Sequence, residues 1–284
     1  MTRFAHVNGR YVRHSAASVH VEDRGFQFAD GVYEVCAVRD GSLIDEGPHI
    51  DRLERSLANL QIGMPVARSA IGVIMRELVA RNRVSDGLVY IQVTRGQARR
   101  DHGFPNPPVT PTLVVTARSL DRASFERRAA AGVKVLLTPE IRWARCDIKS
   151  VSLLPNVLAK QQAREAGCFE AWFVAADGTI TEGASSNAWI VDREGRLRTR
   201  ATSPQILPGI TRAEIMALCR QHGLVCDEKP FSEDDVRTAR EAFVTAATYG
   251  AMPVVQVGSH RIGDGAPGPI AKKIRALYWL TRSG

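Results

Sequence analysis

The sequence contains very little lysine. Of its 38 lysine and arginine residues only six are lysine, so arginine carries most of the positive charge. Arginine keeps its proton in proteins, whereas a lysine amine can lose one and then act as a nucleophile. A lysine that is not needed for surface charge is therefore a candidate for chemistry, and Lys149 in the segment EIRWARCDIKSVSLLPN is the first such candidate.

Cysteine and long apolar runs are also scarce. The five cysteines are odd in number and have no C-x-x-C spacing, which excludes a disulfide framework and a zinc site of the usual kind. The first residues, MTRFAHVNGRYV, lack the apolar segment of a secretory signal, and runs such as TLVVTA are far shorter than a membrane span. We therefore expect a protein of the reducing cytoplasm, without a metal centre and without membrane contact.

Aromatic residues make up only 6% of the chain, and no basic run reaches five residues. The net charge of +8 is dispersed along the sequence, which favours small anionic ligands over nucleic acid. A basic, non-enzymatic protein with salt-sensitive affinity for nucleic acid is the alternative. It leaves the motifs described below without explanation.

The length of 284 residues is sufficient for two domains. We predict an N-terminal α+β domain over 1–120, a linker over 121–132 and a C-terminal domain over 133–284. Strands are mixed with helices, which predicts an α+β class rather than a doubly wound sheet. Hydrophobic spacing and Gly/Pro punctuation predict helices over 48–60, 67–81, 155–166, 211–222 and 269–280. Alternation and turn residues predict strands within 4–12, 31–45, 87–96, 110–118, 133–138, 141–146, 169–191 and 241–250.

The local sequence around Lys149 supports a reactive amine. Trp143, Cys146 and Ile148 precede it in a segment predicted as a strand. An amine against such an apolar background loses its charge more readily, and a neutral amine can attack a carbonyl. The alternative is a surface lysine at the end of a strand, which is the common position for lysine.

A second candidate site is the segment TITEGASSNAWIV. The carboxylate of Glu182 is followed by Gly183 and by the small hydroxyl residues Ser185 and Ser186. Small residues allow a flat ligand to approach the backbone, and hydroxyls donate to phosphate. A polar hairpin connection would have the same composition.

Two further segments are suited to anion binding. In LPGITRAEI, Gly209 precedes a predicted helix whose first backbone N–H groups, at Ile210 and Thr211, point outward. Thr211 as an ordinary helix cap is the alternative. In HIDRLERS, Arg52 either reaches a phosphate or pairs with neighbouring carboxylates on the helix surface.

The segment RGQARRDHGF places Arg100 and His102 two residues apart after a predicted strand. Arginine makes bidentate contacts with carboxylates, so the pair is suited to a carboxylate ligand. A solvated basic loop is the alternative.

The order of these segments resembles the fold-type IV pyridoxal-phosphate aminotransferases, and most closely the D-amino acid aminotransferases. The runs RCDIKS…LLPNVLAKQ and TEGASSN are the most specific, and FADGVYEV, HIDRL and LPGITR add to them. The resemblance covers nearly the whole chain. It implies a two-domain enzyme with a smaller N-terminal α/β domain and a larger, β-barrel-like C-terminal domain with helices.

The resemblance also implies roles for individual residues. Lys149 matches the lysine that binds pyridoxal 5′-phosphate covalently and moves the substrate proton, and Glu182 matches the carboxylate that pairs with the pyridine nitrogen. The other matched cofactor-binding residues are Arg52, Ser185, Ser186, Leu207, Ile210, Thr211 and Ala247. The matched substrate-binding residues are Tyr33, Arg100 and His102.

The Arg100/His102 pair resembles the carboxylate trap of D-amino acid enzymes, which reaches into the neighbouring subunit, so a homodimer is implied. The expected activity is amino transfer from D-alanine or another D-amino acid to a 2-oxo acid such as 2-oxoglutarate by a ping-pong route. A branched-chain L-amino acid aminotransferase and a 4-amino-4-deoxychorismate lyase of the same fold are the alternatives. One departure is that Ala246 and Ala247 stand where the resembling enzymes have hydroxyl residues.

Overall fold

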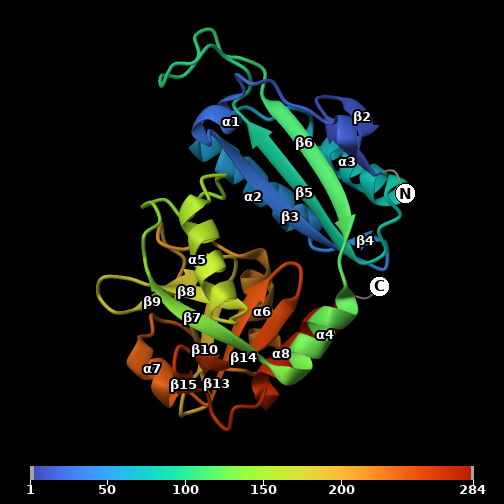
Figure 1. The fold of residues 1–284 in the computed structure, drawn as a ribbon. Coiled ribbons are helices and arrows are strands. Elements are labelled where there is room, and N and C mark those ends of the chain that lie inside the picture. Colours follow the sequence, from blue (N-terminus) through green and yellow to red (C-terminus); the bar gives the residue numbers. More distant parts are fainter. Residues whose placement is uncertain (1–2, 283–284) are drawn as a thin grey trace. The chain divides into compact units, whose positions relative to one another are not determined.

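The computed structural model describes residues 3–282 and divides them into two compact units (Figure 1). The first unit contains the chain up to Arg122 together with Ile148–Ser152. The second contains Ala123–Asp147 and the chain from Leu153 onward. The lysine-bearing segment is thus part of the first unit, although the chain on both sides of it belongs to the second.

The first unit is built on a six-stranded antiparallel sheet with the strand order β2-β1-β6-β5-β3-β4. Its strands are β1 (Phe4–Val7), β2 (Arg10–Arg13), β3 (Gly31–Arg39), β4 (Ser42–Leu43), β5 (Gly87–Thr94) and β6 (Thr112–Ser119). Asn8 and Gly9 join β1 to β2 with positive φ angles of 45° and 84°, as the predicted tight hairpin requires.

Two long helices cover this sheet, and their apolar residues form its core. The helices of the unit are η1 (His14–Ala16), α1 (Arg24–Phe28), α2 (Glu46–Asn59) and α3 (Arg68–Arg81). Leu53 and Leu57 of α2 and Met75 of α3 pack against Val89 and Ile91 of β5 in one buried cluster. Ile148, beside Lys149, belongs to the same cluster, so burial of its side chain fixes the start of the lysine-bearing segment.

The second unit is built on a nine-stranded sheet with the order β12-β11-β10-β13-β14-β7-β8-β9, and β15 pairs with β14 beside this path. Its strands are β7 (Val133–Pro139), β8 (Glu170–Val174), β9 (Ile180–Gly183), β10 (Asn187–Val191), β11 (Leu197–Thr199), β12 (Cys226–Glu228), β13 (Glu241–Ala246), β14 (Gly250–Val257) and β15 (His260–Arg261). Parallel pairs join β14, β7 and β8, whereas β10, β13 and β14 are antiparallel.

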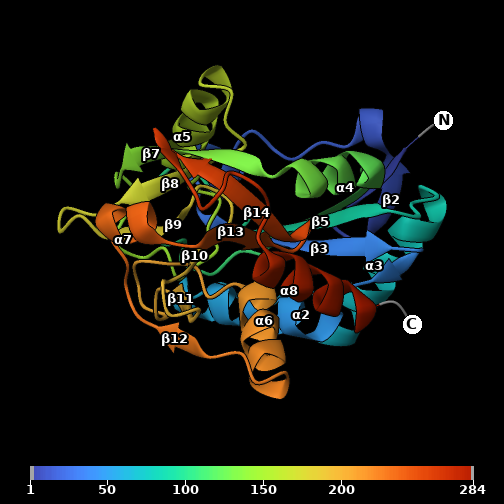
Figure 2. The same cartoon turned by 90° about the horizontal axis from the view of Figure 1, so that it is seen from below.

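Helices pack on the sheet of the second unit at separate places. They are α4 (Arg122–Ala131), α5 (Leu154–Glu165), α6 (Ile210–Gln221), α7 (Glu233–Thr238) and α8 (Pro269–Leu280). Helix α5 contacts β7 and β8, while α6 and α8 contact each other and the strands β13 and β14 (Figure 2). Pro155 lies in the first turn of α5 and Gly167 follows its end, as predicted.

The prediction differs from the structure at several places, of which two strands are the most instructive. The segment 141–146 is not a strand but an irregular loop, because its Arg142 side chain turns inward to carboxylates while Ile141 and Trp143 are exposed. Strand β14 is absent from the prediction, and its run AMPVVQV contains Pro253, a residue that is rare in central strands. In the structure Pro253 nevertheless lies opposite Phe243 of β13.

Among residues 3–282 no helix has the length and apolar character needed to cross a membrane. Within the same range, no group of three or more histidine, cysteine, aspartate or glutamate side chains is arranged to hold a metal ion.

Candidate active site

Lys149 lies on a short stretch of chain that is bonded to the edge of β3. The Tyr33 N–H donates to the Lys149 carbonyl (2.9 Å), and the Val151 N–H donates to the Gly31 carbonyl (3.0 Å). The Lys149 N–H donates to the Ser56 hydroxyl on α2 at 3.4 Å. These backbone bonds fix the lysine main chain on both sides, so its amine is presented from a defined position.

Tyr33 is the side chain that the structure places beside the Lys149 amine. The Lys149 Nζ lies 4.1 Å from the centroid of the Tyr33 ring. The Tyr33 ring in turn stacks on Tyr90, with centroids 5.6 Å apart and an interplanar angle of 27°. The contact with the aromatic face fixes the direction of the amine. Two residues named from the sequence, Lys149 and Tyr33, are thus brought together.

Arg52 is engaged by a buried carboxylate. Its Nε donates to Glu34 Oε1 at 2.6 Å and its Nη2 donates to Glu34 Oε2 at 2.9 Å. The His49 Nδ1 lies 2.9 Å from Glu34 Oε2. Burial alone raises the pKa of Glu34, but the Arg52 charge and the hydrogen bonds from Arg52 and His49 outweigh it and hold the pKa well below its usual range. The role of Arg52 toward a phosphate stays a prediction.

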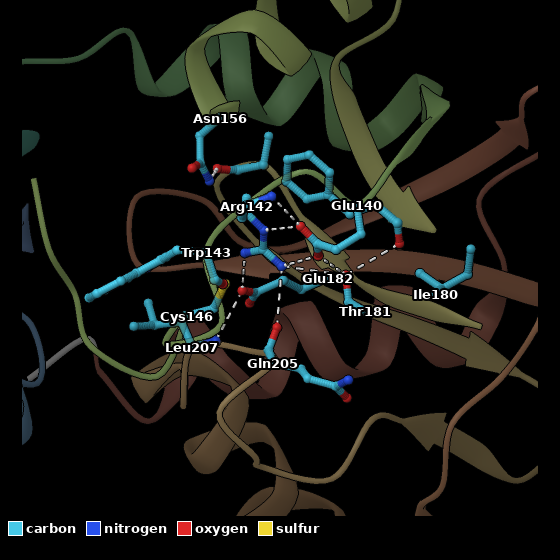
Figure 3. A network of polar contacts seen from close by, with 12 residues as sticks. Glu140, Arg142, Trp143, Cys146, Asn156, Ile180, Thr181, Glu182, Gln205 and Leu207 are labelled. Carbon is cyan, nitrogen blue, oxygen red and sulfur yellow. Dashed lines mark hydrogen bonds and ion pairs between the residues drawn. The ribbon is translucent and has the colours of Figure 1, made fainter. Parts of the chain in front are cut away.

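Glu182 lies on β9 at the centre of a polar network (Figure 3). Its Oε1 accepts from Arg142 Nη1 at 2.6 Å and from the Leu207 N–H at 3.0 Å. Its Oε2 accepts from Asn187 Nδ2 at 3.0 Å. Glu182 is only 4% exposed, so these donors replace water around the carboxylate. The carboxylate is therefore held in one orientation.

Arg142 serves two carboxylates at once (Figure 3). Its Nε and Nη2 donate to Glu140 at 2.9 and 2.6 Å, while its Nη1 donates to Glu182. Burial lowers the pKa of Arg142, but the hydrogen bonds that it donates to Glu140 and the charges of both glutamates outweigh this and raise the pKa, so Arg142 stays protonated. Burial raises the pKa of Glu140, and the bonds to Arg142 outweigh this and hold it below its usual value. The Thr181 hydroxyl also donates to Glu140, at 2.8 Å.

Asn187 connects Glu182 to the start of α6. Its Nδ2 donates both to Glu182 and to the Leu207 carbonyl, each at 3.0 Å. Gly209 is the cap residue before Ile210, and a Cβ on it would lie 2.0 Å from the Asn187 Oδ1. A side chain at Gly209 would therefore displace Asn187, which accounts for the glycine at this position.

The first turn of α6 carries no acidic residue, and its backbone N–H groups have no partner within the helix. Thr211 is not the helix cap, because Gly209 occupies that position. The Thr211 hydroxyl instead lies 3.5 Å from the Tyr278 hydroxyl. Such a helix start attracts an anion through its N–H groups and its partial positive charge.

Ser185 and Ser186 lie in the turn between β9 and β10, and both face a buried carboxylate. Their hydroxyls donate to Glu170 Oε2 at 2.7 and 3.0 Å. Lys160 Nζ lies 3.2 Å from Glu170 Oε1, and Asn156 donates to the Ala184 carbonyl at 2.9 Å. The structure thus gives the two serines a role in fixing this turn. Their predicted contact with a cofactor is not tested by these bonds.

The remaining predicted residues lie at the end of β13 and in loops. Ala246 ends β13, and Ala247 begins the turn that leads to β14. Arg100 and His102 lie in the exposed connection between β5 and β6, against the Phe28 ring.

Three side chains of the Glu182 network are not identified from the sequence: Arg142, Asn187 and Glu140. Arg142 could be expected on physical grounds, since a carboxylate buried as deeply as that of Glu182 requires a positively charged partner. The partner lies 40 residues away in the chain, and spacing alone does not select it among 32 arginines.

Comparison with curated proteins gives relatives that match nearly the full length. A D-alanine aminotransferase of Bacillus licheniformis is 40% identical over 268 residues, which is 94% of this chain and 93% of the relative. A D-alanine aminotransferase of Staphylococcus haemolyticus is 35% identical, covering 95% of this chain and 94% of the relative.

Comparison with solved structures confirms the predicted fold-type IV architecture. The branched-chain amino acid aminotransferase of Escherichia coli superposes with a TM-score of 0.91 at 21% identity, over 99% of this chain and 94% of that one. A putative 4-amino-4-deoxychorismate lyase of Legionella pneumophila has a TM-score of 0.84 at 20% identity, over 95% and 97% of the two chains. At such identities the likeness establishes the fold and not the reaction.

The family model for class IV amino-transferases matches residues 31–257. This range includes β3 with Tyr33, the Lys149 segment, the Glu182 network and the start of α6. Together with the full-length relatives, it establishes that the chain belongs to the class IV aminotransferase family.

Proposed function

We propose that the protein is a D-amino acid transaminase that uses pyridoxal 5′-phosphate. It moves the amino group of D-alanine or another D-amino acid to a 2-oxo acid such as 2-oxoglutarate. The substrate class follows from the D-alanine aminotransferases that are 35–40% identical over almost the whole chain. The observation that carries amino transfer is the Lys149 amine, anchored on β3 and held 4.1 Å from the Tyr33 ring centroid.

The residues present fit the cofactor. Lys149 supplies the amine for its aldehyde, and the buried Glu182 carboxylate supplies an anionic partner for its ring nitrogen. The α6 start, where a Cβ on Gly209 would have no room, supplies backbone donors from Ile210 and Thr211 for its phosphate. A branched-chain amino acid aminotransferase of the same fold has been solved with pyridoxamine 5′-phosphate, at 22% identity and a TM-score of 0.89 over 98% of this chain and 93% of that one.

The other roles follow the same resemblance. We propose that Arg52 contributes to the phosphate site, that Ser185, Ser186, Leu207 and Ala247 line the cofactor, and that Tyr33 borders the substrate. The two serines would do so through the turn that Glu170 fixes.

Arg100 and His102 would receive the substrate carboxylate in a homodimer, each protomer serving its partner. Arg100 is suited to this because its guanidinium can donate two parallel N–H bonds to a carboxylate.

All five cysteines are free thiols, which supports the proposal that the protein works in a reducing cytoplasm.

The roles of the cofactor and of the side chains in the reaction follow from these positions. Pyridoxal phosphate, when bound, supplies an aldehyde that accepts the amino group and a ring that takes up electrons from the substrate α-carbon. Lys149 Nζ would remove the proton from the substrate α-carbon. Because the Lys149 main chain is fixed by β3, the amine would approach from one side only and would return the proton from that side. Glu182, held in place by Arg142 at 2.6 Å, would stabilise a protonated ring nitrogen. The 2-oxo product leaves before the second 2-oxo acid enters.

The test is a comparison of Lys149→Ala with Lys272→Ala, an exposed lysine of α8. With D-alanine and 2-oxoglutarate, we expect Lys149→Ala to lose both pyruvate formation and the visible absorption of the lysine-bound cofactor. Lys272→Ala should keep both. Full turnover in Lys149→Ala would overturn the proposal.

The same assays separate the alternatives. Pyruvate released from 4-amino-4-deoxychorismate without any amino acceptor would identify a lyase. Amino transfer from L-leucine but not from D-alanine would identify a branched-chain aminotransferase, to which the solved neighbours are similar in fold.

A further inference from the structure

The connection between β5 and β6 projects from the sheet of the first unit (Figure 1). It leaves β5 at Thr94, which pairs with Gly31 at the start of β3. Arg100 and His102 are exposed within it. An exposed loop with charged residues is mobile unless something at its base holds it. The structure contains such a base.

The base is a buried ion-pair triad in which Asp30 joins two arginines. Arg24 Nε lies 2.8 Å from Asp30 Oδ2. Arg95 Nε lies 2.7 Å from the same oxygen, and Arg95 Nη2 donates to Asp30 Oδ1 at 3.0 Å. Arg24 and Arg95 are 3% and 7% exposed. Buried charges persist where they are paired and geometrically fixed, so the triad is a rigid platform.

Arg24 extends from this platform to the loop backbone. Its Nη1 donates to the Asp101 carbonyl at 2.6 Å, and its Nη2 donates to the His102 carbonyl at 3.3 Å. One planar guanidinium thus holds two successive peptide groups while Asp30 holds its Nε. A lysine ammonium is a point donor and cannot reproduce this fork.

Phe28 supports the side chains of the same loop. The Arg100 Cζ lies 4.7 Å from the Phe28 ring centroid, and the His102 ring centroid lies 5.4 Å from it. The Arg24 Cζ is also 4.9 Å from this ring. A stacked guanidinium uses its face for the ring, and its N–H edges stay directed outward for a carboxylate.

Arg95 secures the next part of the loop. Its Cζ lies 3.6 Å from the Phe104 ring centroid, and it donates to the Leu60 and Gln61 carbonyls at 2.7 and 3.0 Å. The loop is therefore held from Arg100 to Phe104 by one connected group of buried charges.

We propose that Arg24 and Phe28 are positioning residues that set the enzyme's affinity for the substrate carboxylate. They hold Arg100 and His102 in the arrangement that receives it, and they do not touch the reacting atoms themselves. This inference rests on the proposed transaminase function and adds residues that determine its recognition of carboxylates.

The test uses the holoenzyme and two variants, Arg24→Lys and Phe28→Leu. The decay of the visible cofactor band with D-alanine gives a saturation constant and a limiting rate for the first half-reaction. Equilibrium binding of propanoate, a carboxylate without an amino group, is measured from its perturbation of the same band. For Arg24→Lys we expect both dissociation constants to rise about tenfold, with a limiting rate within about twofold of wild type. For Phe28→Leu we expect a rise of about two- to fivefold.

Limited trypsin digestion at Arg99 and Arg100 reports the loop itself, independently of any reaction. Cleavage should accelerate in Arg24→Lys. The matched control is Arg198→Lys, since Arg198 likewise pairs with a carboxylate, Asp235 at 2.8 Å, and donates to a carbonyl, but lies in the second unit. The control should keep wild-type binding and cleavage.

The outcomes separate this inference from the function on which it rests. If the wild-type protein does not react with D-alanine, the proposed function is wrong. Wild-type protein that reacts, with unchanged dissociation constants in both variants, overturns the positioning role alone. Faster cleavage without weaker propanoate binding also overturns it, because the loop would then be anchored by Arg24 without setting carboxylate affinity.

Discussion

Each of the two units contains a deeply buried glutamate paired with an arginine, and the two pairs are built differently. In the first unit, Glu34 has both oxygens engaged by cations, with Arg52 across both and His49 on one. In the second, Glu182 has Arg142 on one oxygen and a neutral amide on the other. Full ionic pairing stabilises the folded chain. A carboxylate with one oxygen on a neutral donor is better suited to pair with a cationic group of a ligand.

The two arginines differ in the same way. Arg52 directs two nitrogens to the single carboxylate of Glu34, whereas Arg142 divides its donors between Glu140 and Glu182. The charge of Arg142 is thus offset by two anions. Glu34 is thus bound by cations on both oxygens, whereas Glu182 is bound by a cation on one oxygen and by a neutral amide on the other, and this difference leads to measurable effects.

The largest expected effect is on stability, in Glu34→Gln. The substitution leaves the Arg52 guanidinium buried beside a neutral partner, which should lower the free energy of unfolding by about 3–5 kcal/mol. Urea unfolding followed by circular dichroism measures it. Glu77→Gln, which breaks an exposed pair with Arg81 at 2.7 Å, is the control and should cost under about 0.5 kcal/mol. Equal losses in the two variants would show that Glu34 is not a structural ion pair.

The next effect is on catalysis, in Glu182→Gln. An amide cannot stabilise a protonated ring nitrogen as a carboxylate does, so kcat for D-alanine should fall about 100-fold, the size typical for the loss of one electrostatic stabiliser. The holoenzyme absorption spectrum and steady-state kinetics measure it. If Glu182→Gln keeps the wild-type kcat and loses as much stability as Glu34→Gln, the two glutamates do not differ in the way proposed.

A smaller effect is expected in Gly209→Ala. The new Cβ would lie 2.0 Å from the Asn187 Oδ1, and relieving that overlap should cost about 1–3 kcal/mol. A Cβ added at Gly47 of α2 would have no atom within 4 Å, so Gly47→Ala is the matched control and should be neutral or stabilising by up to about 1 kcal/mol. Thermal unfolding of both variants distinguishes crowding from a general intolerance of alanine.

The smallest effect is the pH dependence of the Glu34 pair. The pKa of Glu34 is lowered in the folded state, so the stability it contributes is present above its unfolded value of 4.5 and is lost as the pH falls below that value. The difference in unfolding free energy between wild type and Glu34→Gln should therefore shrink below pH 4.5, by at most about 1.4 kcal/mol per pH unit. A difference that stays constant between about pH 6 and about pH 3 would contradict the pairing.

The sequence predicts the local parts of this molecule well. Helix α8 begins and ends at the predicted residues, 269 and 280, because a proline opens it and apolar residues recur at helical spacing. The hairpin at Asn8–Gly9 has the positive φ angles that its residues favour. Strand β14 cannot be predicted from local residue preferences, since Pro253 lies inside it. Its position between β13 and β7 is decided by tertiary packing.

For the candidate site, the sequence names residues whose chemistry is distinctive, and their roles stay predictions, whereas the partners that the structure gives them could not be named. Lys149 and Glu182 stand out as a scarce amine and as a carboxylate next to small residues. Arg142 and Asn187 are ordinary in sequence and gain their roles only when folding places them at Glu182. The predicted strand over 141–146 even assigns Arg142 to the wrong kind of structure.

The most direct test of the account is the visible absorption spectrum of the purified protein after incubation with pyridoxal phosphate, recorded before and after D-alanine and, separately, L-leucine. We expect a yellow band that disappears with D-alanine, releases one pyruvate per site and persists with L-leucine. A band lost only with L-leucine would contradict the substrate class and the use of Arg100 and His102. A protein that stays colourless would contradict the role of Lys149.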